Sequence, residues 1–311
     1  MKRIVSLLLT MFVLLFTATA IAQGYAEPTL YNASDVLGLE TLYRLYDRSY
    51  YEEPSDQPGT VISIKYTSEV YDKPYKRYMN VYLPYGYDES GTERYPVIYF
   101  FHGRGCDQDT LIGNPQTKNA FDNMIATGIA KPFILVTPTY YYDVRHNLYD
   151  IDLFAKELRT EIMPLVEGTY RTYAQTADDE GFRASRNMRA ISGFSMGSMT
   201  TMSLFDKMVD YSYYFLPFSG AGDWSNVLNV IDSMSEYADE FFIYMACGGE
   251  EDGAYEGCVS LVKTMAADTA HFSYGKDWVE NNFYFCLSDN IHQDLTSRYY
   301  LYNAFVDGLF Q

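Results

Sequence analysis

The sequence has little of several residue types on which protein functions commonly depend. Only 4 of its 311 residues are histidine and 4 are cysteine, and its 23 lysines and arginines face 41 acidic residues. A formal net charge of −18 produces a surface that repels nucleic acid and anionic lipid, so we expect neither nucleic acid nor membrane as a partner. A neutral polysaccharide would not be repelled.

The four cysteines are Cys106, Cys247, Cys258 and Cys286. They form no C-x-x-C pair and no cluster with histidine at the spacing of metal ligands, which argues against a zinc site. In an oxidising compartment they could form two disulfides in any of three connectivities, and free buried thiols fit the sequence equally well.

The chain has no long hydrophobic run outside its first residues. Residues 4–16 are apolar, follow Lys2 and Arg3, and lead into small residues that end at Ala22. This run is too short for a membrane span of about 20 residues, so the pattern predicts a cleaved export signal over residues 1–22 and a secreted or periplasmic protein. Its removal leaves 21 basic residues against 41 acidic ones, a net charge near −20.

The remainder of the chain predicts one large domain. Residues 59–311 contain no linker, repeat or second hydrophobic core, and their number suits a single domain. Residues 23–58 are polar apart from a helix-like patch at 37–46, and we expect them to lie across the domain surface as an N-terminal extension.

The pattern of apolar residues predicts an α/β fold. Residues 61–66 and 78–83 read as an antiparallel pair, and residues 151–166 carry apolar side chains at helical spacing. Short apolar runs separated by helix-like stretches predict a mostly parallel central sheet flanked by helices, with ligands at the carboxyl ends of its strands. These runs are 97–101, 133–137, 188–191, 214–218, 241–246 and 283–287.

A G-x-S-x-G motif at residues 193–197 follows one of these strands and precedes a helix-like stretch at 198–208. In this strand-turn-helix context the motif predicts a nucleophile elbow, whose flanking glycines permit a sharp, strained turn. Ser195 is then the nucleophile. The Met196 N–H, at the start of the helix, would stabilise the oxyanion of a tetrahedral intermediate.

A serine nucleophile needs a base, normally a histidine oriented by a carboxylate. His292 is the histidine that follows the last strand, at the carboxyl edge of the sheet, and it is the predicted base. His271 precedes that strand and so belongs at the opposite end, while His146 lies in a loop as a surface or substrate-contact residue. His102 directly follows the strand at 97–101.

The segment that begins at His102 predicts the second half of the oxyanion site. A backbone N–H of Gly103 or Arg104 would complete it.

Three carboxylates, Glu250, Glu251 and Asp252, follow the strand at 241–246 and compete for the orienting role. We favour Asp252 because the turn residue Gly253 comes next. The alternative is a solvated acidic loop, and Asp223 is the reserve candidate.

The sequence is rich in aromatic residues, with 32 tyrosines and 19 phenylalanines. Most of them are explained by core packing. Trp224, Tyr140 and Tyr141 fall in loops expected at the catalytic edge, where they could stack on a substrate ring or simply pack at the rim.

The motif and its surroundings resemble the feruloyl esterases of carbohydrate esterase family 1. The segment that carries the resemblance is residues 184–198, and further similar stretches occur in the same order over about residues 59–311. These stretches are 80–88, 101–103, 137–140, 157–159 and 282–285.

The resemblance implies an α/β-hydrolase fold, release of hydroxycinnamate or acetate from plant xylan, and no cofactor. It also implies Ser195 as nucleophile, His292 as base and Asp252 as acid. The sequence departs from the family at Arg104, which stands where the family has a glycine, and after His292, where Gln293 and Asp294 replace aromatic residues.

These observations favour a secreted serine esterase that cleaves hydroxycinnamoyl (feruloyl) esters on plant cell-wall xylan through a Ser-His-Asp triad and an acyl-enzyme. The runner-up is an acetylxylan or other short-chain carbohydrate esterase, which would take acetylated xylan as its partner. An acyltransferase would use the same triad, and a non-catalytic glycan-binding module is the alternative of another class.

Overall fold

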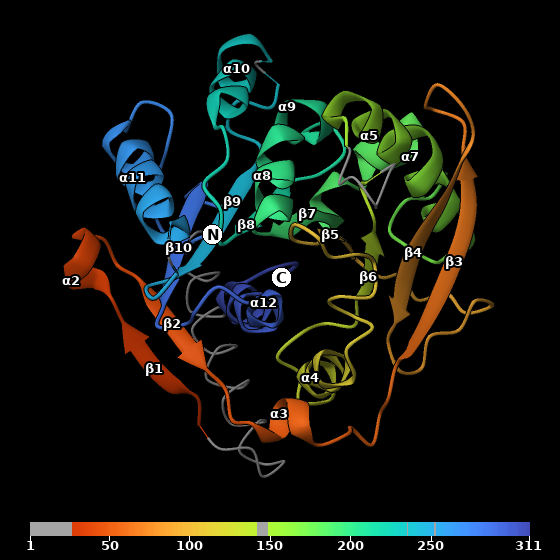
Figure 1. The fold of residues 1–311 in the computed structure, drawn as a ribbon, viewed down its shortest axis with the longest axis horizontal. Helices are drawn as coiled ribbons and strands as arrows, with labels where there is room; N and C mark the ends of the chain where they lie inside the picture. Colours follow the sequence, from red (N-terminus) through yellow and green to blue (C-terminus); the bar gives the residue numbers. More distant parts are fainter. Residues whose placement is uncertain (1–26, 142–148, 235, 252) are drawn as a thin grey trace, which may run out of the picture.

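The computed structural model describes residues 27–311, except 142–148, 235 and 252. Its centre is an eight-stranded sheet in the order β10-β9-β8-β7-β5-β6-β4-β3 (Figure 1). The six strands β10, β9, β8, β7, β5 and β6 are each parallel to their neighbours in this order. Strand β4 is antiparallel to both β6 and β3. The predicted α/β fold is confirmed. The strands are β3 (Thr60–Ser68), β4 (Tyr75–Leu83), β5 (Val97–Phe101), β6 (Ile134–Pro138), β7 (Arg189–Phe194), β8 (Tyr214–Phe218), β9 (Phe242–Gly248) and β10 (Phe283–Ser288).

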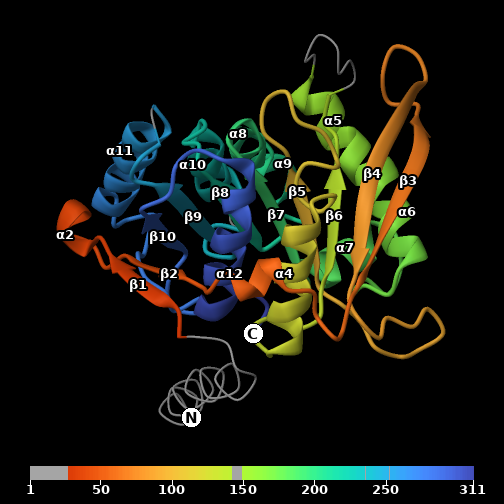
Figure 2. The ribbon, with the colours of Figure 1, turned by 60° about the horizontal axis from the view of Figure 1, so that its bottom comes forward.

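Helices cover both faces of the sheet (Figure 2). Alternate side chains of each strand point to opposite faces, so Tyr99 and Ile191 join the core under α5 to α11, while Ile98 and Phe100 join the core under α4 and α12. The helices are α4 (Pro115–Ala126), α5 (Ile151–Glu157), α6 (Met163–Thr169), α7 (Asp179–Ala184), α8 (Met196–Ser203), α9 (Phe205–Met208), α10 (Ser225–Ser233), α11 (Ala254–Ala267) and α12 (Ser297–Asp307), with short 3-10 turns η2 (Arg186–Met188) and η3 (Asp294–Thr296).

The helix predicted over residues 151–166 is present but interrupted. A π-helical turn, η1 (Leu158–Ile162), joins α5 to α6. It ends two residues before Pro164, which has no N–H to donate to the carbonyl of Thr160, so the regular hydrogen-bond ladder is interrupted at this point.

The N-terminal extension differs from the prediction in its local structure. The patch at 37–46 is not a helix: a short helix, α2 (Ser34–Leu37), ends at its start, and β2 (Leu42–Leu45) then pairs antiparallel with β1 (Thr29–Asn32). The extended form allows the Leu42 N–H to donate to the Tyr284 hydroxyl of β10 at 2.9 Å. After one more short helix, α3 (Ser49–Glu52), the chain enters β3.

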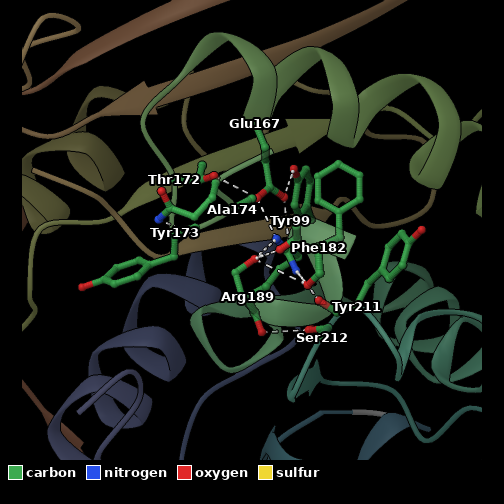
Figure 3. A network of polar contacts seen from close by, with 12 residues as sticks. Tyr99, Glu167, Thr172, Tyr173, Ala174, Phe182, Arg189, Tyr211 and Ser212 are labelled. Carbon is green, nitrogen blue, oxygen red and sulfur yellow. Dashed lines mark hydrogen bonds and ion pairs between the residues drawn. The ribbon is translucent and has the colours of Figure 1, made fainter. Parts of the chain in front are cut away.

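A buried ion pair anchors the strand that carries the nucleophile motif (Figure 3). Arg189, the first residue of β7, donates from Nε and Nη2 to the two carboxylate oxygens of Glu167 on α6, at 2.8 and 2.7 Å. The hydroxyls of Tyr99 and Thr172 donate to the same carboxylate at 3.0 and 2.9 Å. Because both charges are buried and every carboxylate oxygen has partners, this network fixes the base of β7 against α6.

The predicted export signal, residues 1–22, lies outside the described residues and stays a prediction. Within the described part of the chain, no helix combines the length and the apolar character that crossing a bilayer requires.

Candidate active site

Ser195 stands on a strained turn between β7 and α8. Its backbone has φ of 56° and ψ of −114°, values that a non-glycine residue rarely adopts. Side chains are excluded on either side: a Cβ at Gly193 would lie 2.3 Å from the Gly197 carbonyl oxygen, and one at Gly197 would lie 2.1 Å from the Phe101 carbonyl oxygen. The glycines of the motif are therefore required by close backbone contact, as the sequence predicts.

Ser195 and His292 lie together although 97 residues separate them. The Ser195 Oγ is 2.8 Å from the His292 Nε2, and the Nδ1 of the same ring is 2.9 Å from a carboxylate oxygen of Glu251. Both His292 and Glu251 follow carboxyl ends of neighbouring parallel strands, β10 and β9, which brings them to the edge where Ser195 stands. The arrangement suits an activated serine nucleophile.

The carboxylate in contact with His292 is thus Glu251, the residue before the predicted Asp252, which lies outside the described residues. Glu251 is buried, and its Oε1 accepts hydrogen bonds from the Ser219 hydroxyl at 2.7 Å, the Gly248 N–H at 2.8 Å and the Tyr300 hydroxyl at 3.1 Å. These donors hold one oxygen and leave Oε2 facing the imidazole.

The reserve candidate, Asp223, has a different role. Its carboxylate accepts the backbone N–H of Ser225 at 2.9 Å, in the first turn of α10.

The pKa of His292 is raised above its ordinary value. The hydrogen bond to Glu251 is the main cause, desolvation opposes it, and the charges of Glu251 and Asp294 add to the rise. A buried carboxylate that stabilises the imidazolium is what a histidine needs to accept the serine proton during attack.

Two of the predicted oxyanion donors, Met196 and Gly103, adjoin the nucleophile. Met196 is the first residue of α8, and the N–H groups in the first turn of a helix have no partner within the helix. Gly103 is buried, and a Cβ on it would stand 3.6 Å from the Ser195 Cβ, while Arg104 is exposed. The Gly103 N–H has a partner in this structure: it donates to the Asp294 Oδ1 at 3.3 Å.

His102, Tyr140 and Tyr141 form a buried stack beneath this loop. The His102 ring lies parallel to the Tyr140 ring at 4.6 Å, its Nε2 is 3.0 Å from the Thr139 hydroxyl, and burial lowers its pKa. The Tyr140 hydroxyl donates to the His102 carbonyl at 3.0 Å.

Both tyrosines are 1 % exposed, so neither presents a ring face to a ligand in this structure. Their hydroxyls instead contact the backbone of the loop that follows β5, at Gly105 and His102.

Trp224, the third aromatic residue predicted at the site, is partly buried. It lies directly before α10, with its ring 6.0 Å from the Phe272 ring, so packing accounts for its observed contacts. His271 bonds to Asp268 at 2.7 Å, and His146 lies outside the described residues. All four cysteines are free.

Two acidic residues of the site escaped sequence reasoning. Glu251 could not be separated from its neighbours by spacing. Asp294 was visible only as a departure from the family after His292; its approach to Gly103 depends on the η3 turn.

Comparison with known proteins shows the family to which the chain belongs. The model of the family described as putative esterase matches residues 74–230, half of the chain. The endo-1,4-beta-xylanase Y of Acetivibrio thermocellus is 32 % identical over 264 residues, covering 82 % of this chain and 23 % of that protein. An endo-1,4-beta-xylanase/feruloyl esterase of Xylanibacter ruminicola is 26 % identical over 71 % of this chain and 29 % of its own length.

The chain therefore spans about a quarter of the length of these curated relatives. Among solved structures, the feruloyl esterase module from Clostridium thermocellum, complexed with sinapinate, has a TM-score of 0.76 and 29 % identity, covering 92 % of this chain and 96 % of that one. The ferulic acid esterase of Anaeromyces mucronatus, at 22 % identity and a TM-score of 0.62, shares the fold. The chain belongs to the esterase family, and its single domain has the α/β-hydrolase fold of the feruloyl esterases.

Proposed function

We propose that this protein is a serine esterase that releases hydroxycinnamic acids, such as ferulate, from plant cell-wall xylan. The observation that carries the proposal is the continuous contact from Ser195 Oγ through the His292 imidazole to the buried Glu251 carboxylate, at 2.8 and 2.9 Å. The substrate class rests on the relatives, which are named as xylanases and feruloyl esterases.

In the proposed reaction, the Ser195 Oγ attacks the ester carbonyl carbon while His292 Nε2 takes the hydroxyl proton. The carbonyl oxygen becomes an oxyanion held by the Met196 N–H and a second N–H from Gly103 or Arg104. As the C–O bond to the alcohol breaks, His292 returns the proton to the leaving oxygen, and an acyl-enzyme remains. Water, activated by the same imidazole, then hydrolyses the acyl-enzyme and restores Ser195.

Glu251, in this proposal, holds the Nδ1–H tautomer of His292 and stabilises the imidazolium. Its buried position and the three donors to Oε1 support that role, because they hold the carboxylate in a fixed orientation toward the imidazole. The proposed triad is therefore Ser195, His292 and Glu251, in place of the Asp252 that the sequence favoured.

The test is release of free acid from methyl ferulate, feruloylated arabinoxylan and acetylated xylan, with Ser195→Ala as the matched inactive variant. Ferulate release that Ser195→Ala abolishes supports the proposal. Acetate release alone would assign the protein to the short-chain carbohydrate esterases instead. No turnover on any ester, with polysaccharide still bound, would refute an esterase and leave a binding module.

We further propose that the protein is exported and that residues 1–22 are removed. The basic start, the apolar run at 4–16 and the small residues before Ala22 support this. N-terminal sequencing of the protein recovered from the host's culture medium or periplasm should begin near Gln23. Recovery of the full chain in the cytoplasm would refute it.

A further inference from the structure

A second carboxylate, Asp294, lies beside the nucleophile and is not used in the reaction described above. It stands in η3, two residues after His292. A Cβ built on Gly103 would lie 2.8 Å from the Asp294 Oδ1 and 3.6 Å from the Ser195 Cβ. The carboxylate and the nucleophile therefore both border Gly103.

The contacts of Asp294 are few and long. Oδ1 accepts the Gly103 N–H at 3.3 Å and Oδ2 accepts the Cys106 thiol at 3.5 Å. Burial, with the charge of Asp294 adding to it, raises the pKa of Cys106 to about 11, so the thiol keeps its proton at neutral pH and is a weak donor. Within the described part of the chain, no lysine, arginine or histidine forms an ion pair with Asp294.

The hydrogen-bond partners of Asp294 differ from those of Glu251, the carboxylate in contact with His292. That carboxylate is buried and receives three hydroxyl or backbone donors on one oxygen, and the imidazole and the Cys247 thiol, the latter at 3.6 Å, on the other. Asp294 is half-buried. A carboxylate has about four lone-pair sites, so Asp294 retains acceptor capacity that Glu251 has already used.

The contact with Gly103 also conflicts with catalysis. An N–H that donates to Asp294 is not free to stabilise an oxyanion, so Asp294 must release Gly103 if that donor is used. Hydroxyl groups bond strongly to carboxylates, and an ester whose alcohol is a sugar brings several of them near the reacting carbonyl. A methyl ester brings none on its alcohol side.

We propose that Asp294 is a specificity-determining residue that accepts hydrogen bonds from hydroxyl groups of the sugar carrying the ester, and that this contact draws the carboxylate off the Gly103 N–H. Sugar esters are then favoured over simple alkyl esters because the sugar both fills the Asp294 acceptors and frees an oxyanion donor. The inference rests on the proposed esterase function and adds the alcohol side of the substrate to it.

The experiment compares two esters of the same acid, methyl ferulate and the feruloyl ester of methyl arabinofuranoside. The wild-type protein, Asp294→Ala and the isosteric Asp294→Asn are measured on both, with Asp289→Ala as the control. Asp289 is an exposed carboxylate on the same connection after β10, so its removal changes the net charge equally. Thermal unfolding of each variant shows whether it is folded.

We expect Asp294→Ala to lower kcat/KM on the sugar ester about ten- to a hundredfold more than on methyl ferulate, which corresponds to the loss of a hydrogen bond to a charged group. Asp294→Asn should show the same preference change with a smaller factor, and Asp289→Ala should show none. An equal fall on both esters in folded variants, or no fall on the sugar ester, would overturn the inference. Wild-type protein inert on both esters would refute the proposed function itself.

Discussion

Replacement of Glu251 by glutamine tests the proposed triad at the point where sequence and structure differ. The variant keeps the size of the side chain, and its amide oxygen can still accept the three donors that hold Oε1. The amide nitrogen then takes the place of Oε2 and presents N–H groups to the His292 Nδ1. Since Nδ1 must accept from it, the ring proton moves to Nε2, which can no longer act as a base toward Ser195.

The magnitude follows from this tautomer change. Conversion of the triad carboxylate into an amide lowers kcat about 10⁴-fold in a Ser-His-Asp triad of unchanged geometry. The 2.9 Å contact and the burial of Glu251 lead us to expect a fall of about 10³- to 10⁴-fold here. A comparable fall is not expected from the neighbouring carboxylates Glu250 and Asp252.

The assay is kcat for release of ferulate from methyl ferulate, with Glu250→Gln and Asp252→Asn as matched controls. Thermal unfolding checks that Glu251→Gln remains folded. A loss of less than about tenfold in Glu251→Gln, together with a loss of about 10³-fold or more in Asp252→Asn, would refute the assignment and restore the acid that the sequence favoured.

Three further outcomes are expected. First, kcat/KM should fall as the pH drops through the raised pKa of His292, because only the neutral ring is a base. In Glu251→Gln the acidic limb of the pH-rate profile should shift to lower pH, and an unmoved limb would contradict Glu251 as the main cause of the raised pKa. Second, Arg189→Met leaves the Glu167 carboxylate buried without its cation and should lower the free energy of unfolding by about 3–5 kcal/mol in urea titrations; a change below about 1 kcal/mol would show that the carboxylate is not held charged. Third, Gly197→Ala places a methyl group 2.1 Å from a backbone carbonyl oxygen and should cost about 3 kcal/mol of stability and most activity, so an active, equally stable variant would refute the packing argument.

Much of the fold follows from local sequence. The runs at 97–101 and 214–218 coincide with β5 and β8 because strands buried on both faces are short, apolar and bounded by polar turns. The helix predicted for residues 37–46 was wrong because the conformation of this segment depends on distant partners: β2 is extended where its backbone N–H donates to the Tyr284 hydroxyl. The pattern of apolar residues within a ten-residue segment cannot predict a contact with a residue so distant in the chain.

The candidate site was predictable where the backbone motif determines it. Ser195 is specified by its flanking glycines and His292 by its place after the last strand. The acid is different, because Glu250, Glu251 and Asp252 are adjacent and only the path of the loop after β9 selects among them. In the structure the carboxylate that contacts His292 is Glu251, which accepts hydrogen bonds from Ser219 and Tyr300, residues that lie 32 and 49 positions away in the chain.

The hairpin formed by β1 and β2 bears on how the protein behaves in concentrated solution. A sheet of eight strands ends in two edges, and a bare edge offers its backbone to any other extended chain. At one end β3 carries Lys65, a charge that discourages such pairing. At the other end β2 packs beside β10, with Arg44 paired to Asp307 at 2.8 Å. Loss of the hairpin would uncover the backbone of β10, so one consequence would be self-association of the molecules through this edge. The same loss would remove Tyr43 of β2, whose hydroxyl accepts the Asn290 side-chain N–H at 2.8 Å in the connection that leads to His292.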